Sequence, residues 1–251
     1  MSWTIGCDPE FFISKYGKHL SAIGLIGGSK DFPRKLKREG FAILEDNVSV
    51  EFNVAPAANY PDFLEGIRYV MDGLKAHTLK DYDFSTESAV VFDADQLTHP
   101  QAMEFGCEPD YNAWTKDVNP RPCAADAALR SAGGHVHVGT KEDPIEVIRA
   151  MDLFLGVPST RMDNGKLRRQ LYGKAGSFRQ KDYGCEYRTL SNFWIFDDAL
   201  VRWVYESTAK AIAFVEEGNV ISVEDGHLIQ QCINNDSREA YEILKTTHGL
   251  A

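Results

Sequence analysis

The order of strand-like and helical patterns is the feature that most limits how this chain can fold. Short apolar or alternating runs, which are typical of strands, come in sequence-adjacent pairs, and helical patterns do not alternate regularly with them. A doubly wound parallel sheet needs a helix after nearly every strand, so this order favours an α+β fold. We expect an antiparallel or mixed sheet with helices on one face. The predicted strands are residues 3–13, 41–45, 48–54, 89–93, 135–139 and 187–194.

Helical patterns are expected between and after these strands. Pro61 suits the first turn of a helix, and apolar residues follow it at a spacing of three to four. Further helices are predicted from residue 144, from Asp197 or Asp198 to about residue 215, and within the last 25 residues. No long linker rich in Pro, Gly or Ser interrupts the pattern, so we expect residues 1–251 to form a single domain.

The charge balance limits the partners of this chain. Its 251 residues include 27 basic and 37 acidic side chains, which gives a formal net charge of −10. Nucleic acids bind proteins largely through neutralised phosphates, so we expect no nucleic-acid partner except a modified nucleotide as a substrate. No run reaches the roughly 18 apolar residues of a membrane span, and the first residues do not resemble a signal peptide. We therefore expect a cytoplasmic protein without a membrane partner.

The five cysteines are spaced irregularly and include no Cys-x-x-Cys pair. An odd number at such spacing argues against a disulfide framework and against a structural zinc site. Cys7 and Cys185 precede acidic residues, so a cysteine nucleophile is one interpretation. The interpretation that we favour is that they are small buried residues.

Four strand-like segments carry polar residues two apart, and residues two apart in a strand share a face. Each set alone is typical of a strand with one solvated face, of a coincidental or zinc-binding His pair, or of an ion pair. Taken together, so many carboxylates with one or two imidazoles need a cation if they are to lie close together. Oxygen-rich ligands with a minority of His favour Mg²⁺ or Mn²⁺ over zinc. The sets are Asp8 with Glu10, Glu51 with Ser49 and Asn53, His135 with His137, and Glu186 with Arg188.

A basic cluster precedes the last of these sets. Mg²⁺ held by several carboxylates usually also binds substrate phosphates, which basic side chains help to neutralise. We therefore interpret this cluster as a phosphate-facing site. Its members include Arg168, Arg169, Lys174, Arg179 and Lys181.

The order of these motifs resembles that of the glutamine synthetase and glutamate–cysteine ligase superfamily. GCDPEFF at 6–12 resembles its first acidic strand, where two acidic residues flank a proline, and residues 45–56 resemble its second acidic strand. GHVHV at 134–138 resembles its Gly-x-His-x-His strand, and EYR at 186–188 resembles its late Glu-x-Arg strand. RRQLYGKAGSFR at 168–179 resembles the segment before that strand in the carboxylate–amine ligase branch. The whole set, over about residues 5–195, is most similar to the phage-type carboxylate–amine (COOH.NH2) ligases, type 2.

The resemblance implies a fold like the glutamine synthetase catalytic domain, with a metal-binding inner sheet face and helices on the opposite face. It also implies ATP and two to three Mg²⁺ or Mn²⁺ ions. Glu10 and Glu51 would hold the ion nearer the acceptor substrate. Asp8, His135 and Glu186 would hold the ion on the nucleotide phosphates.

The remaining site residues follow from the same resemblance. His137 would contact ATP phosphate or the carboxylate substrate, Arg188 would steady the transferred phosphoryl group, and Glu51 would join them as a catalytic residue. Either Glu45 or Asp46 would be a further metal ligand, because a turn at 46–47 would exchange them. The residues expected to bind ATP or substrate are Asn53, Arg168, Arg169, Lys174 and Arg179.

The implied reaction joins a carboxylate to an amine through an acyl phosphate. We expect small-molecule or peptide carboxylates and amines as substrates, a homo-oligomer as one way to complete the pocket, and the host cytoplasm as the location if a phage encodes the chain. The alternatives are a guanidino or amine kinase on the same scaffold, a non-catalytic binding protein and, more weakly, a metallohydrolase that uses the two His. The loops at 27–33 and 106–114 are candidate substrate loops or ordinary turns. Candidates for the amine base are Glu45, Asp46, Glu108 and Asp110.

Overall fold

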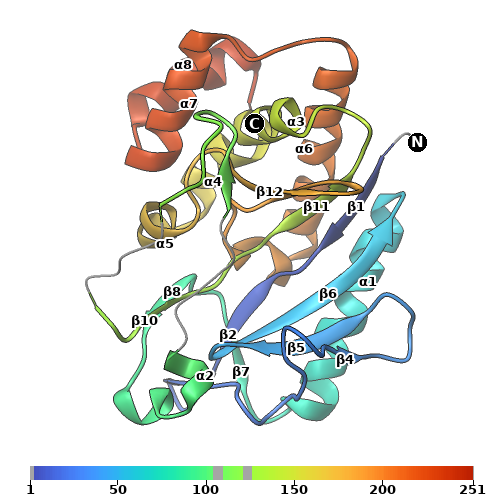
Figure 1. Cartoon of the computed structure of the whole chain (residues 1–251), viewed down its shortest axis with the longest axis vertical. Coiled ribbons are helices and arrows are strands. Elements are labelled where there is room, and N and C mark those ends of the chain that lie inside the picture. Colours follow the sequence, from blue (N-terminus) through green and yellow to red (C-terminus); the bar gives the residue numbers. More distant parts are fainter. Residues whose placement is uncertain (1–2, 104–109, 121–125, 251) are drawn as a thin grey trace.

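A large antiparallel sheet organises the structure (Figure 1). The computed structural model describes residues 3–103, 110–120 and 126–250. Among these residues, the sheet follows the order β3-β2-β6-β1-β11-β13-β12-β9, β4, β5 and β7 attach to it, and β8 pairs separately with β10. The strands are β1 Thr4–Cys7, β2 Glu10–Lys15, β3 Lys18–Leu20, β4 Arg34–Lys35, β5 Ala42–Asp46, β6 Ser49–Ala57, β7 Asp83–Ser85, β8 Ala89–Val91, β9 Tyr111–Asn112, β10 Leu129–Ser131, β11 Val136–Gly139, β12 Ser177–Lys181 and β13 Gly184–Tyr187.

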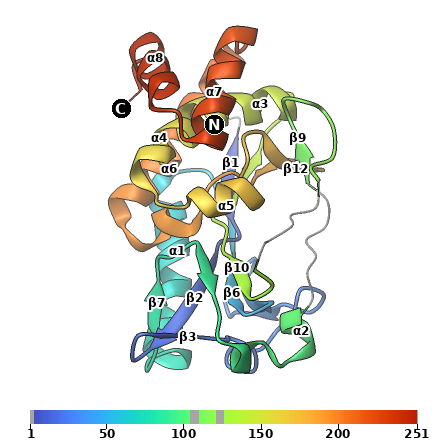
Figure 2. The ribbon, with the colours of Figure 1, turned by 90° about the vertical axis from the view of Figure 1, so that its left-hand side faces the viewer.

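Helices pack against the sheet and extend beyond it. Figure 2 shows α1 and α6 on one side of the sheet and β10 and α2 on the other. The helices are α1 Tyr60–Gly73, α2 Pro100–Met103, α3 Pro144–Met151, α4 Val157–Met162, α5 Lys166–Leu171, α6 Asp198–Glu216, α7 Val223–Asn235 and α8 Arg238–His248, with 3-10 turns at Ala94–Leu97 and Asn192–Phe196 and π-helical turns at Leu74–Thr78 and Asp152–Gly156. The mixed α+β class and the antiparallel sheet are thus confirmed. In the described part of the chain, every helix is too short or too polar to cross a bilayer.

The main core lies between the sheet and the helices α1, α3 and α6. Val136 and Val138 of β11 are fully buried there with Ile67 of α1, Ile148 of α3 and Val204 of α6. Burying these apolar side chains stabilises the fold, and it assigns one face of β11 to the helices. The intervening side chains of β11 therefore point to the other face.

The predicted helix starts are confirmed by their caps. Side-chain oxygens of Asn59, Asp143 and Asp197 accept hydrogen bonds from first-turn backbone N–H groups of α1, α3 and α6 at 3.0, 2.8 and 2.7 Å. Such a cap satisfies donors that have no partner within the helix. Of the two aspartates proposed for α6, Asp197 is therefore the capping residue.

The prediction of one strand over residues 3–13 was wrong. The chain leaves β1 at Cys7 and enters β2 at Glu10, with Asp8 and Pro9 between them. Pro9 has no N–H to donate to a sheet, which favours a break at this point. β1 pairs with β11 and β6, whereas β2 pairs with β3, β6 and β7. Asp8 and Glu10 consequently do not share the face of one strand.

The prediction of a strand over residues 187–194 was also wrong. β13 ends at Tyr187, and Ser191 precedes a 3-10 turn. Between them the chain stays close to β11, since Gly134 donates its N–H to the carbonyl oxygen of Leu190 at 3.0 Å. The strand β12 was not predicted because SFRQK has little apolar alternation.

Asp152 anchors the end of β13 and the residues after it through hydrogen bonds. It lies in the π-helical turn that follows α3 and is fully buried. Its Oδ1 accepts hydrogen bonds from the hydroxyls of Tyr187 at 2.8 Å and Thr189 at 3.3 Å. These two residues alternate with Glu186 and Arg188, so the contacts help to aim the latter pair at the opposite face.

Candidate metal and substrate site

A row of cross-strand neighbours crosses the middle of the sheet. Gly6 of β1 pairs with His137 of β11, His137 pairs with Glu186 of β13, and Glu186 pairs with Arg179 of β12. Directly paired residues point to the same face of a sheet. The register therefore places an imidazole, a carboxylate and a guanidinium side by side on the face away from the helices.

Asp8, just after β1, completes a cluster with His137 and Glu186. The three residues offer ligand atoms within 4.8 Å of one another, and Nε2 of His137 lies 2.9 Å from Oδ1 of Asp8. Burial disfavours the Asp8 carboxylate, but contacts with His137 and His135 outweigh it and hold its pKa well below the ordinary value. Burial and Asp8 also disfavour charge on Glu186, yet Arg188 and the two His lower its pKa to about 2. We name Asp8, His137 and Glu186 the first cluster, and both of its carboxylates are ionised at neutral pH.

His135 and Arg188 lie against the first cluster. Nδ1 of His135 is 3.4 Å from Oδ1 of Asp8 and 3.9 Å from Oε1 of Glu186. Burial and the Arg188 charge lower the pKa of His135 to about 4, so the ring is neutral at pH 7. The Arg188 guanidinium contacts the Glu186 carboxylate directly. The resemblance implied His135 as the ligand here, whereas the geometry puts His137 in the cluster and His135 beside it.

A second cluster contains Glu10, Asp46 and Glu51, whose ligand atoms also lie within 4.8 Å of one another. Glu10 and Glu51 are direct cross-strand partners in β2 and β6. Burial and the Asp46 charge raise the pKa of Glu10 to about 7, and burial with the neighbouring carboxylates raises the pKa of Glu51 well above its ordinary value. Close carboxylates resist joint ionisation unless a cation lies among them. The second cluster is therefore suited to a positively charged ligand.

Glu45 lies on the other face of β5 and is absent from both clusters. Its Oε1 accepts backbone N–H groups of Gly24, Ile26 and Gly27 at 2.9, 3.2 and 2.8 Å. The loop held in this way continues to Lys30, whose Nζ lies 3.6 Å from Oδ2 of Asp46. Of the two alternatives at 45 and 46, Asp46 is the one in a cluster, and Glu45 anchors a loop.

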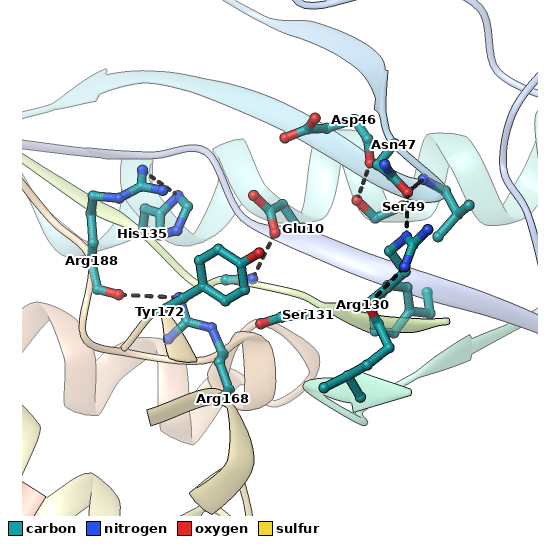
Figure 3. A pocket seen from close by; sticks show the side chains of 14 residues that line it. Glu10, Asp46, Asn47, Ser49, Arg130, Ser131, His135, Arg168, Tyr172 and Arg188 are labelled. Atoms are coloured by element: carbon teal, nitrogen blue, oxygen red, sulfur yellow. Dashed lines mark hydrogen bonds between the residues drawn. The ribbon is translucent and has the colours of Figure 1, made fainter. Parts of the chain in front are cut away.

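A cavity of about 90 Å³ opens beside the second cluster. Figure 3 shows Glu10 between two groups of side chains, with His135 and Arg188 on one side and Asp46 on the other. Tyr172, directly after α5, lies on the lower side of Glu10 in this view. The cavity thus joins the second cluster to the residues that flank the first. Its polar lining includes Glu10, Asp46, Asn47, Ser49, Arg130, Ser131, His135, Arg168, Tyr172 and Arg188.

The basic residues that were expected to bind phosphate divide into two groups. Arg168 is buried and donates to the carbonyl oxygens of Thr189 and Arg188 at 2.9 and 3.1 Å, so it supports the segment after β13 while lining the cavity. Arg169 is buried away from the clusters in an ion pair with Asp163 at 3.2 Å. Arg169 does not line the cavity beside the second cluster.

The other group lies around Glu186 of the first cluster. Nη1 of Arg179 is 3.6 Å from Oε1 of Glu186, and Nζ of Lys181 is 2.8 Å from Oε2. Lys174 follows α5 and accepts a hydrogen bond from the Thr189 hydroxyl through its carbonyl oxygen at 3.0 Å. Arg179 and Lys181 therefore supply positive charge at the first cluster.

A second cavity of about 350 Å³ opens on the other side of the first cluster. Asp8 and His137 lie at this cavity, together with Gly6, Tyr183 and the predicted substrate-binding residue Asn53. The two cavities flank the first cluster from opposite directions along the sheet. Such an arrangement gives two approaches to one charged centre.

Several expectations fall on or near undescribed residues. Glu108, a candidate amine base, lies outside the described residues, as do Cys107 and Cys123. Asp110, another candidate, has Oδ2 3.7 Å from Nε of Arg188. Cys7, Cys185 and Cys232 are buried, as the favoured interpretation of the cysteines predicted.

Sequence reasoning did not single out Tyr172, Tyr183 or Arg130 as site residues. Tyr172 and Tyr183 lie outside the alternating strand motifs, so periodicity carries no signal for them. Arg130 lies in β10, a three-residue strand that was not predicted. Its guanidinium donates to the Asn47 side chain and the Ala102 carbonyl oxygen, among others, and so joins β10 to the wall of the cavity.

A comparison with known protein families finds one that part of this chain resembles. The family model described as Phage phiEco32-like COOH.NH2 ligase-type 2 matches residues 116–230. None of the curated proteins compared with the chain matches it. The matched region contains His135, His137, Glu186 and Arg188, while the remaining acidic ligands of both clusters precede it. The resemblance inferred from the sequence is thus confirmed over residues 116–230, where the chain is similar to this phage-type family of carboxylate–amine ligases.

Proposed function

We propose that the chain is an ATP- and Mg²⁺-dependent ligase that forms an amide through an acyl phosphate. The observation that carries this proposal is the pair of carboxylate-rich clusters, the first in contact with Arg179 and Arg188 and the second close enough to Arg188 and Arg168 for their charges to act on Glu10. ATP sites often use carboxylate-bound Mg²⁺ together with basic side chains to neutralise the phosphates. The family match supports the general reaction, in which a carboxylate is joined to an amine.

The donor atoms of the first cluster fit a divalent cation. Oδ1 of Asp8, Nε2 of His137 and Oε2 of Glu186 are buried, and the described residues offer them charged contacts, Asp8 with His137 at 2.9 Å and Lys181 with Glu186 at 2.8 Å, without a hydrogen bond of good geometry. Carboxylate oxygens with one imidazole suit Mg²⁺ or Mn²⁺. In the second cluster, burial and the neighbouring carboxylates raise the pKa values of Glu10 and Glu51, and a cation among these carboxylates would favour their charged forms. When bound, the ions would supply positive charge that neutralises phosphate oxygens and polarises the phosphoryl group.

Arg188 is placed to support phosphoryl transfer from its position against Glu186. A substrate carboxylate oxygen attacks the γ-phosphorus, the bond to the β–γ bridging oxygen breaks, and ADP leaves. The amine nitrogen then attacks the acyl carbon, inorganic phosphate departs, and the amine loses a proton. Arg188, Arg179 and Lys181 stabilise the negative charge of the transferred group because they surround Glu186 at the first cluster.

ADP release tests the proposal. The purified chain is incubated with MgATP and pools of carboxylates and amines, and ADP is measured with each pool alone and with both together. Release that needs both pools supports ligation. Release with one pool and a stable phosphorylated product would identify a kinase instead, and a chain that neither binds nor hydrolyses ATP under any condition would refute the enzymatic proposal.

Site variants sharpen the same experiment. Arg188→Ala is expected to lower kcat by a factor of about 10² to 10³ through loss of one group that stabilises transition-state charge. Glu51→Ala is expected to lower kcat by a similar factor through loss of a proposed ligand of the ion that would supply such charge. Arg202→Ala is the matched control, since Arg202 is an exposed arginine of α6 that pairs with Glu206. Near-normal turnover of either site variant would show that its residue lies outside the reaction centre.

A further inference from the structure

Tyr183 is held rigidly beside the first cluster, although it is half-exposed and lies in a turn. It lies in the tight turn between β12 and β13, where Thr140 donates its N–H to the Tyr183 carbonyl oxygen at 2.9 Å. The next residue, Gly184, has φ of 145°, and a Cβ there would lie 2.2 Å from the carbonyl oxygen of Val138. The backbone of the turn is therefore pressed against β11, the strand that carries His137.

The Tyr183 side chain meets His137 in two ways. The two rings stack with centroids 6.0 Å apart and planes 30° apart. The phenol oxygen also contacts Nδ1 of the imidazole. Nε2, on the far side of the same ring, faces Oδ1 of Asp8 at 2.9 Å. Nδ1 of His137 thus points toward the Tyr183 phenol, and Nε2 points into the first cluster.

We propose that Tyr183 is a positioning residue that fixes the ring orientation and tautomer of His137 for metal binding at the first cluster. This inference rests on the proposed function, because it assumes that the cluster binds a divalent cation. A neutral imidazole offers a lone pair on one nitrogen only, so metal binding through Nε2 requires the proton on Nδ1. The Tyr183 oxygen accepts that N–H, and the stacked ring limits rotation of the imidazole.

The oxygen of Tyr183 is the decisive atom, so Tyr183→Phe is the variant of choice. It keeps the stacked ring and removes only the group that contacts Nδ1. Loss of the partner that orients a metal-binding His typically weakens metal affinity 10- to 100-fold. Tyr16→Phe is the matched control, because Tyr16 is 92% exposed and lies in a different turn.

Mn²⁺ binding is measured by electron paramagnetic resonance in a Glu51→Gln background, which removes a ligand of the second cluster. We expect Tyr183→Phe to raise the Kd of the first cluster by a factor of 10 or more, and Tyr16→Phe to leave it unchanged. Ring ¹⁵N shifts of His137 in the Mg²⁺-loaded protein report whether its Nδ1–H is hydrogen-bonded. They should show a hydrogen-bonded Nδ1–H in the Glu51→Gln parent and loss of that hydrogen bond in Tyr183→Phe.

Two failures are distinguishable. If the Glu51→Gln parent binds Mn²⁺ and Tyr183→Phe binds it equally well with unchanged ring ¹⁵N shifts of His137, the role assigned to Tyr183 is wrong and the metal site stands. If neither the parent nor the unmutated chain binds Mn²⁺, the metal-dependent function and the inference about Tyr183 both fail.

Discussion

Burial of Asp152 is expected to make the protein less stable as the pH rises from about 4 to about 7. Burial raises the pKa of this carboxyl group to about 7, even though hydrogen bonds from Trp114, Tyr187, Gly176 and Thr189 act in the opposite direction. The folded state therefore binds the proton more tightly than the unfolded state. Its stabilising effect is complete below the unfolded pKa near 4 and is lost as the pH reaches the folded value.

The magnitude follows from the same two values. One pKa unit corresponds to about 1.4 kcal/mol, so a single proton gives a slope of at most about 1.4 kcal/mol per pH unit. Between pH 5 and pH 8, this linkage amounts to about 2–3 kcal/mol for Asp152. Glu10, whose pKa is also raised to about 7, contributes with the same sign, and His135, whose pKa is lowered to about 4, contributes with the opposite sign. The effect of Asp152 must therefore be isolated by comparison with a variant.

Asp152→Asn is that variant. Its amide oxygen can still accept from Nε1 of Trp114 and the N–H of Gly176, which donate to Asp152 at 2.7 and 2.6 Å, and its NH2 can face the hydroxyls of Tyr187 and Thr189. Urea unfolding of both proteins at pH 5, 6, 7 and 8 gives the two free energies of unfolding. We expect the wild type to lose about 2–3 kcal/mol relative to the variant across this range. Parallel pH profiles would refute the reasoning.

Three further predictions concern the loop, a helix cap and the metal clusters. Glu45→Gln should lower the free energy of unfolding in urea by about 1–3 kcal/mol, because the charged acceptor of three loop N–H groups is lost; an unchanged midpoint would contradict this anchoring role. Asn59→Ala should cost about 1 kcal/mol through loss of the α1 cap, measured in the same way, and a cost below a few tenths would show that the cap is not needed. Mg²⁺ at about 100 times its Kd should stabilise the chain by about 2.7 kcal/mol in thermal unfolding, and the gain should shrink in Asp8→Asn, whereas an equal gain in both would place the ion elsewhere.

Sequence alternation was informative where a residue lies inside a regular strand. His137 and Glu186 were singled out by their two-residue spacings, and the sheet places them side by side through direct pairing. Asp8 and Glu10 show the limit of that reasoning. Their spacing indicated one strand face, but the chain changes pairing partners at Pro9, and the two carboxylates enter different clusters. Alternation describes local geometry and does not report which strands become neighbours.

The choice between Glu45 and Asp46 depended on where a strand ends. Asn47, with φ of 54°, makes the tight turn between β5 and β6 and puts Asp46 opposite Ser49. Glu45 then faces the loop at 24–27. The spacing of residues within a strand cannot predict this contact, because the loop is a separate segment of the chain. Tyr183 was missed for a similar reason, because its role depends on a turn lying against a strand far from it in the sequence.

The strand order has a consequence for how the protein reaches its native state. The hairpins β5–β6 and β12–β13 join segments that are close in the sequence, whereas β1 lies between β6 and β11. Contacts such as that between Glu10 and Gly133 join residues 123 positions apart. Closing so long a loop is slow compared with forming a hairpin. We therefore expect the first cluster to assemble late in folding, so that the proposed cation site forms only when the two halves of the sheet have met.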